Sequence, residues 1–158
     1  MEFPRAVSIL GEDYEVRRDV CLMIDHSRRL IRMNPGDAGH RKRLLRAMRL
    51  ILLQEIEPMI EEYAKKLGVE VKRVSIKNMR GRWGSCAGDG NLNFSLWLVC
   101  LPRELIRYVV FHEVAHIIEK NHGRDFKRII ETEFENRREL ERRLRGQKVP
   151  AQLEPGWD

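Results

Sequence analysis

The sequence predicts an α+β fold in a single domain, and three observations support this. The chain has 158 residues, enough for one domain with a buried core. Short extended segments occupy the first 37 residues and recur between residues 69 and 99. Stretches with apolar residues at three- and four-residue steps lie between and after these segments, which is typical of helices. Strands and helices are therefore both expected.

The first 68 residues are expected to form strands followed by one long helical run. Strands are predicted over residues 5–10 and 14–17, and residues 20–33 are expected to be extended with a turn near residues 25–27. The break at 34–37 precedes helical periodicity over residues 40–67, which Gly68 ends. Pro58 lies inside this run and is expected to kink or split it.

Residues 69–146 are expected to hold a second group of strands and two further helices. Strands are predicted over residues 69–77 and 91–99, with an extended segment at 79–86 and a turn at 87–90. Pro102 opens a predicted helix over residues 103–120, which must be buried because it is apolar on most faces. Residues 124–145 predict one charged helix with pairs of opposite charge four residues apart. The chain is thus organised as N-terminal strands (1–37), a helix (38–68), a sheet with an active-site helix and a C-terminal helix (69–146), and a tail (147–158).

Composition restricts the classes of protein to consider. The net charge is +6, with 30 basic and 24 acidic residues interspersed, so a nucleic acid or nucleotide partner is a candidate without being required. The three cysteines show no metal-binding or disulfide-scaffold spacing. Neither a secretory signal nor an apolar run of about 20 residues is recognisable. We therefore expect a cytoplasmic protein with no membrane partner, whose oligomeric state the sequence leaves open.

The segment HEVAHIIEKNH, residues 112–122, carries the strongest functional signal. His112 and His116 are four residues apart, so on a helix their side chains lie on one face, one turn apart. Two imidazoles at this spacing can bind one metal ion, and a zinc ion with three protein ligands keeps a position open for catalysis. Glu113 lies beside this face as a candidate general base. The pattern therefore predicts a zinc-dependent hydrolase.

His122 is the expected third zinc ligand. On an unbroken helix it would point away from the other two rings, so the helix is expected to end between residues 119 and 121. Asn121 and Gly123 both suit a helix terminus. The alternative third ligand is a carboxylate of the last predicted helix, at Glu131, Glu133 or Glu135. Two other histidines, His26 and His40, lack ligand spacing and are expected on the surface.

The catalytic role of Glu113 would be to take a proton from a metal-activated water and to pass it to the leaving amine. A further donor would stabilise the negative charge that develops on the substrate oxygen. The candidates that the sequence offers without distinguishing them are Arg82, Asn93, Tyr108 and Arg124.

Several linked motifs over residues 70–130 resemble the YgjP-like metallopeptidases, which are relatives of the SprT-like and WLM zinc proteins. The motifs are RWGSC (82–86), GNLNFS (90–95), LP (101–102), YVVFHEVAH (108–116), NHG (121–123) and Phe126. The resemblance implies a zincin-like fold, in which a small twisted sheet packs on a buried active-site helix with flanking helices. It implies zinc on His112, His116 and His122, with Glu113 catalytic. It also implies that the strand near residues 92–96 lines the cleft and pairs with an extended peptide, so Arg82, Asn93 and Phe94 are the expected substrate-binding residues.

Three functions are consistent with the sequence. The first is a zinc metallopeptidase acting on peptides or proteins. The second is a metal-dependent nucleoside triphosphate pyrophosphatase, which the resemblance leaves open although no glycine-rich phosphate loop is present. The third is a protease associated with DNA, as in SprT-like relatives, for which the basic charge is the motive. Cys86, within RWGSC, is expected to pack in the sheet and not to act on the metal.

Overall fold

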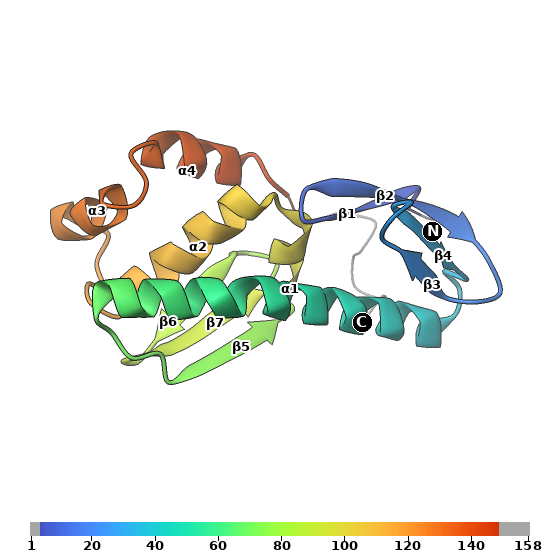
Figure 1. The fold of residues 1–158 in the computed structure, drawn as a ribbon, viewed down its shortest axis with the longest axis horizontal. Helices are drawn as coiled ribbons and strands as arrows, with labels where there is room; N and C mark the ends of the chain where they lie inside the picture. Colours follow the sequence, from blue (N-terminus) through green and yellow to red (C-terminus); the bar gives the residue numbers. More distant parts are fainter. Residues whose placement is uncertain (1–3, 149–158) are drawn as a thin grey trace.

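The computed structural model describes residues 4–148 and shows two small sheets joined by one long helix (Figure 1). The α+β prediction is confirmed. The predicted tail from residue 149 onward lies outside the described residues. None of the described helices contains a stretch long and apolar enough to cross a membrane.

The N-terminal sheet contains four strands in the order β1-β2-β4-β3. Their bounds are Ala6–Ile9 (β1), Glu12–Arg18 (β2), Met23–Asp25 (β3) and Leu30–Met33 (β4). The β1–β2 and β3–β4 pairs are antiparallel, whereas β2 and β4 are parallel. The hairpin tip is tied to the rest of the molecule because the Leu10 amide donates to the Val99 carbonyl at 2.7 Å.

Helix α1 (Ala38–Leu67) runs as one element along both sheets (Figure 1). Asp37 caps its start by accepting hydrogen bonds from the amides of Gly39 and His40, and Gly68 ends it in a left-handed conformation with φ 66°. The expected split at Pro58 was wrong, since the helix continues through it. Both Pro58 and Gln54 are exposed, so the Gln54 carbonyl that loses its helical partner can bond to water.

His40 also corrects the sequence-based expectation that it lies on the surface. It is 6% exposed, and its Nδ1 accepts a hydrogen bond from the Asn34 amide at 2.9 Å. This bond satisfies a backbone donor in the turn before α1. His26 is exposed, as expected, and bonds to the hydroxyl of Tyr14.

The second sheet has the order β5-β7-β6, from β5 (Arg73–Lys77), β6 (Gly84–Ala87) and β7 (Asn91–Ser95). β7 pairs in parallel with β5 and antiparallel with β6. The predicted strand over 91–99 is therefore shorter than expected, because residues Leu96–Cys100 form a buried 3₁₀ helix. Leu96 through Val99 are at most 2% exposed and connect the two sheets through the core.

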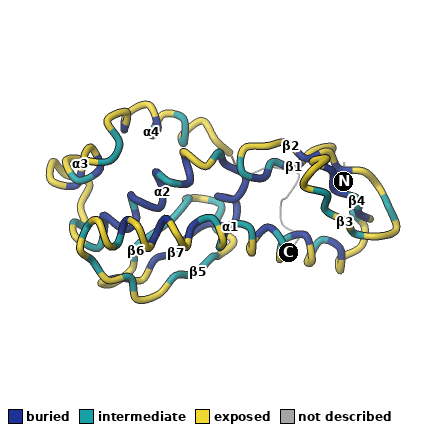
Figure 2. The backbone as a smooth tube through the Cα atoms, in the orientation of Figure 1, coloured by how far each residue is buried: buried dark blue, intermediate teal, exposed yellow. Residues whose placement is uncertain are grey.

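Helix α2 (Arg103–Ala115) is buried on most sides, as its apolar sequence predicted (Figure 2). It packs between α1 and β6, with the Phe111 ring 4.8 Å from that of Tyr63 on α1. The last predicted helix is in fact two, α3 (Arg124–Glu131) and α4 (Arg137–Arg145). α3 and α4 both contact α2.

Candidate metal centre

Three imidazole nitrogens converge at the C-terminal end of α2. The Nε2 atoms of His112 and His116 are 3.2 Å apart, and the Nε2 of His122 lies 3.2 Å from the first and 3.0 Å from the second. Among the described residues, these three form the group of His, Cys, Asp and Glu side chains close enough to hold one ion. None of the three carboxylates proposed as alternatives belongs to this group; Glu131 pairs with Arg137 and Glu133 with Lys66, and Glu135 is exposed.

The chain reverses after α2 so that His122 can reach the other two rings. The helix ends at Ala115, earlier than the expected 119–121, and residues 116–118 form a tighter turn. The amides of Ile117 and Ile118 donate to carbonyls three residues earlier, and the Glu119 amide donates to Ala115. His116 remains within reach of His112 because it still has helical backbone angles, φ −64° and ψ −18°.

The spacing and the protonation of the rings both fit a zinc ion. Zinc–nitrogen bonds of about 2.0–2.1 Å in a tetrahedron place neighbouring nitrogens about 3.3 Å apart, close to the observed 3.0–3.2 Å. Burial, with repulsion from the neighbouring imidazoles, lowers the pKa of His112 to about 4, and burial also lowers the pKa of His116. Neutral rings have a lone pair to donate. His116 Nδ1 lies 3.0 Å from the Glu119 carbonyl, which fixes the proton on Nδ1 and leaves Nε2 free for a ligand.

Phe126 supports all three rings from one side. It stacks on His116 at 4.4 Å between ring centroids, and its edge contacts with His112 and His122 are at 4.9 and 5.0 Å. Phe126 is 3% exposed and lies in the first turn of α3. Sequence reasoning gave it no role at the site. A spacing of four residues from His122 to Phe126 would place the two side chains on one face of a helix. That signal could not be used, because the helix starts only at Arg124, after His122.

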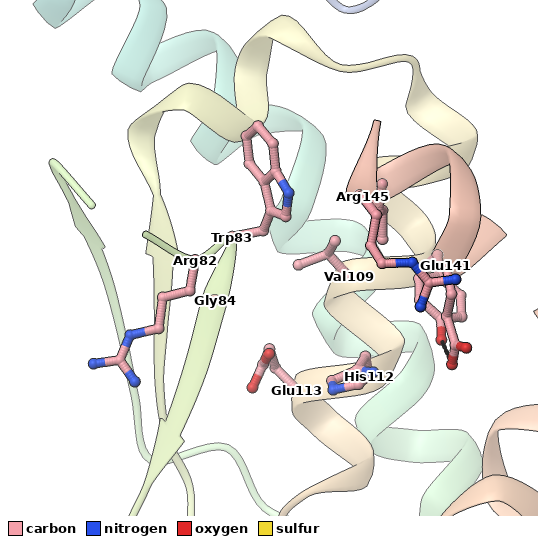
Figure 3. Close-up of a pocket in the computed structure, with 10 residues that line it drawn as sticks. Arg82, Trp83, Gly84, Val109, His112, Glu113, Glu141 and Arg145 are labelled. Atoms are coloured by element: carbon pink, nitrogen blue, oxygen red, sulfur yellow. Dashed lines mark hydrogen bonds between the residues drawn. The ribbon is translucent and has the colours of Figure 1, made fainter. Parts of the chain in front are cut away.

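Glu113 lies beside His112 (Figure 3) and is 6% exposed. Burial raises the pKa of its carboxyl to about 7, and the charge of Arg82 acts in the opposite direction. Among residues 4–148, no hydrogen bond or ion pair engages this carboxylate. A dication beside it would favour the ionised form. Glu113 is therefore a buried carboxylate that is free to exchange a proton.

Gly84 makes room for Glu113 and was missed by sequence reasoning, although it stands in RWGSC. A Cβ added at Gly84 would lie 2.9 Å from Glu113 Cγ and 3.2 Å from the Asn93 carbonyl oxygen. The strand β6 can thus approach α2 only with glycine at this position.

Gly84→Ala is expected to reduce kcat/KM for a peptide substrate by roughly ten- to hundredfold, because the added methyl group displaces the Glu113 side chain. Zinc content and the helical circular dichroism signal should stay at the wild-type level. The matched control is Gly36→Ala, in the turn before α1, where the added atom would meet only Asn34 Oδ1 at 3.4 Å. Equal losses in both variants would contradict the role assigned to Gly84.

Two cavities adjoin the imidazoles. One, of about 360 Å³, lies on the side of β6 and Lys120 and is lined in part by Cys86, whose pKa is raised by burial and by Glu113. The other, of about 310 Å³, lies between the segment before β6 and helix α4 (Figure 3). Arg82, one of the expected substrate-binding residues, lines both cavities.

The structure does not bring the other two expected substrate-binding residues to this site. Phe94 is fully buried, and Asn93 donates a hydrogen bond to Ser85 at 3.3 Å while lining a separate hollow. The expectation that their strand pairs with a peptide was wrong, because β7 already pairs on both sides. Strand order depends on contacts between distant residues, which the pattern of one segment does not contain. The strand next to α2 is β6.

Two of the candidate hydrogen-bond donors for the substrate oxygen, Tyr108 and Arg124, are not positioned to contact it. The Tyr108 hydroxyl donates to Glu141 at 2.9 Å, and Arg124 begins α3 on the exposed side. Arg82 remains at the cavity beside Glu113.

Comparison with known proteins agrees with this arrangement. Residues 5–147 match the family described as "YgjP-like, metallopeptidase domain". Two solved structures share the fold, the metallopeptidase zymogens abylysin of Pyrococcus abyssi and jannalysin of Methanocaldococcus jannaschii. Each is 24% identical with a TM-score of 0.53 and covers 58% of this chain, which corresponds to 92% of abylysin and 94% of jannalysin. No curated protein matches the sequence.

Proposed function

Because this chain belongs to the YgjP-like metallopeptidase family, we propose that it hydrolyses peptide bonds with one zinc ion held by His112, His116 and His122. The observation that carries the proposal is the convergence of three imidazoles, whose Nε2 atoms lie within 3.2 Å of one another, with a buried carboxylate beside them. When bound, zinc would polarise the substrate carbonyl and lower the pKa of a coordinated water.

Glu113 acts as the general base in this proposal. Its carboxylate accepts a proton from the water that attacks the scissile carbonyl, and the same group then donates that proton to the leaving amine. The closed surroundings supplied by β6 and α2 keep competing water away from the carboxylate and so hold its proton affinity high. Arg82, which lines the cavity beside Glu113, is the residue we assign to stabilise developing negative charge on the substrate oxygen.

Metal removal tests the proposal directly. The purified protein is expected to contain about one zinc ion per chain by mass spectrometry and to cleave casein or a quenched fluorescent peptide mixture. Dialysis against a chelator should abolish cleavage, and one equivalent of zinc should restore it. Zinc should also raise the melting temperature, because it binds the folded state. Undiminished cleavage by metal-free protein would refute the proposal.

The same preparation separates peptide hydrolysis from the nucleotide alternative. We expect no release of pyrophosphate from UTP or the other nucleoside triphosphates under conditions in which peptide is cleaved. Zinc-dependent pyrophosphate release without peptide cleavage would assign the site to nucleotides instead.

A further inference from the structure

The cavity between α2 and α4 is an apolar chamber that opens directly beside Glu113 and His112 (Figure 3). Its walls are Trp83, which precedes β6, Val109 on α2 and Leu144 on α4. Its volume of about 310 Å³ is about ten times the roughly 30 Å³ that a water molecule occupies in the liquid. The chamber therefore has room for one large side chain, and burial there would favour an apolar one.

A second cavity, of about 460 Å³, continues from the apolar chamber and is strongly basic. The two share Arg82, Trp83, Leu144 and Arg145. Arg80 and Lys148 also line the second cavity, and none of the described residues lining it is acidic. We call this second cavity the cationic vestibule.

Three of the cations that line the vestibule have no salt-bridge partner among the described residues. Within residues 4–148, Arg82, Arg145 and Lys148 take part in no ion pair. Glu141 lines the apolar chamber near Arg145, but its carboxylate already accepts hydrogen bonds from Arg137 and Tyr108. The vestibule thus presents guanidinium groups to a ligand, and these suit a carboxylate because they can donate two parallel hydrogen bonds.

We propose that the apolar chamber and the cationic vestibule select the substrate, as an apolar residue next to the scissile bond followed by a carboxylate. This inference rests on the proposed peptidase function and specifies its substrate class. The apolar side chain enters between Trp83, Val109 and Leu144, and the carboxylate binds at Arg145 and Arg82. That carboxylate belongs either to an Asp or Glu side chain or to the C-terminus of a short peptide.

Binding of four labelled peptides to zinc-loaded Glu113→Gln protein tests this selection without requiring cleavage. The reference peptide contains one leucine among alanines and ends in an amide. The second peptide has the same sequence and ends in a free carboxylate. The third keeps the amide end and carries an added glutamate. The fourth ends in a free carboxylate and has serine in place of leucine. Fluorescence anisotropy gives Kd for each, and kcat/KM is measured in parallel with the wild type.

We expect a carboxylate to tighten binding by about two- to fivefold, which is the range of an exposed ion pair. Serine in place of leucine should weaken it by about tenfold or more. If only the free C-terminus tightens binding, the vestibule recognises the C-terminal carboxylate of a peptide. If the added glutamate tightens binding equally, the vestibule also accepts an acidic side chain. Equal Kd values for all four peptides would overturn the proposal, as would tighter binding of a nucleoside triphosphate than of any peptide.

Arg145→Gln supplies the matched variant, with Arg142→Gln as its control. Both residues are exposed on α4, but Arg142 does not line either cavity. In combination with Glu113→Gln, the Arg145 change should reduce the carboxylate advantage to nearly one, and the Arg142 change should leave it intact. A carboxylate advantage that survives Arg145→Gln would refute the assignment. If binding is selective but the wild type cleaves no peptide, the proposed peptidase function is wrong and the assigned binding preference stands. If the wild type cleaves peptides but binding is not selective, the assigned preference is wrong and the peptidase function stands.

Discussion

Replacing His122 by alanine is expected to lower zinc affinity by at least a hundredfold and to abolish peptide cleavage at stoichiometric zinc. Loss of a group that only orients a ligand already costs about 10- to 100-fold in metal affinity, and loss of a ligand costs more. His122 is exposed, so the free energy of unfolding of the metal-free protein should change by no more than about 0.5 kcal/mol. Competition with a zinc-sensitive dye measures the affinity, and thermal unfolding measures the stability.

The control for this variant is His26→Ala, another exposed histidine on the distant N-terminal sheet. It loses a hydrogen bond with Tyr14 but contacts none of the three converging imidazoles. Its zinc affinity should equal that of the wild type. Unchanged affinity in the His122 variant would mean that the third ligand is another group.

Glu113→Gln is expected to lower kcat by about 10²- to 10⁴-fold while zinc stays bound. Glutamine has nearly the size of glutamate, so the packing against Gly84 is preserved, but an amide cannot accept the proton of the attacking water. Single-turnover kinetics on a fluorescent peptide, with zinc content measured on the same sample, tests this. Glu139→Gln on the exposed side of α4 is the control and should retain wild-type kcat. A Glu113→Gln protein with more than a tenth of the wild-type kcat would exclude the general-base role.

Local signals were sufficient for much of the fold. The end of α1 at Gly68 was predicted correctly, because glycine readily adopts the left-handed conformation found there. The burial of α2 was predicted correctly from its apolar faces. The approach of His122 to the other two rings also followed from local chemistry, since a chain that continued as a helix would have turned it away.

The break between α3 and α4 shows where local signals failed. The sequence predicted ion pairs Glu133/Arg137, Glu139/Arg143 and Glu141/Arg145 along one helix. In the structure Glu133 instead pairs with Lys66 on α1, and Arg143 pairs with Glu104 on α2. Contacts with distant elements therefore replaced two of the expected local pairs, and Glu141 pairs with Arg137 instead of Arg145.

Packing of Phe134 gives a physical reason for the break. Phe134 lies between α3 and α4, and its ring contacts Tyr108 at 5.4 Å and Phe111 at 5.7 Å. The Thr132 hydroxyl donates to the Ile129 carbonyl, which occupies an acceptor at the end of α3. Neither glycine nor proline occurs between α3 and α4. The break therefore depends on packing against the aromatic residues of α2, which the sequence of residues 132–136 alone does not predict.

The contact of Phe126 with all three imidazoles has a thermodynamic consequence for loading the enzyme. Side chains that are held by packing have few rotamers to lose, so an arriving ion meets a set of donors whose conformational entropy was already given up during folding. Small zinc fingers differ, because in them the ion must also drive folding. Here we expect a metal ion to bind to and leave a chain that stays folded.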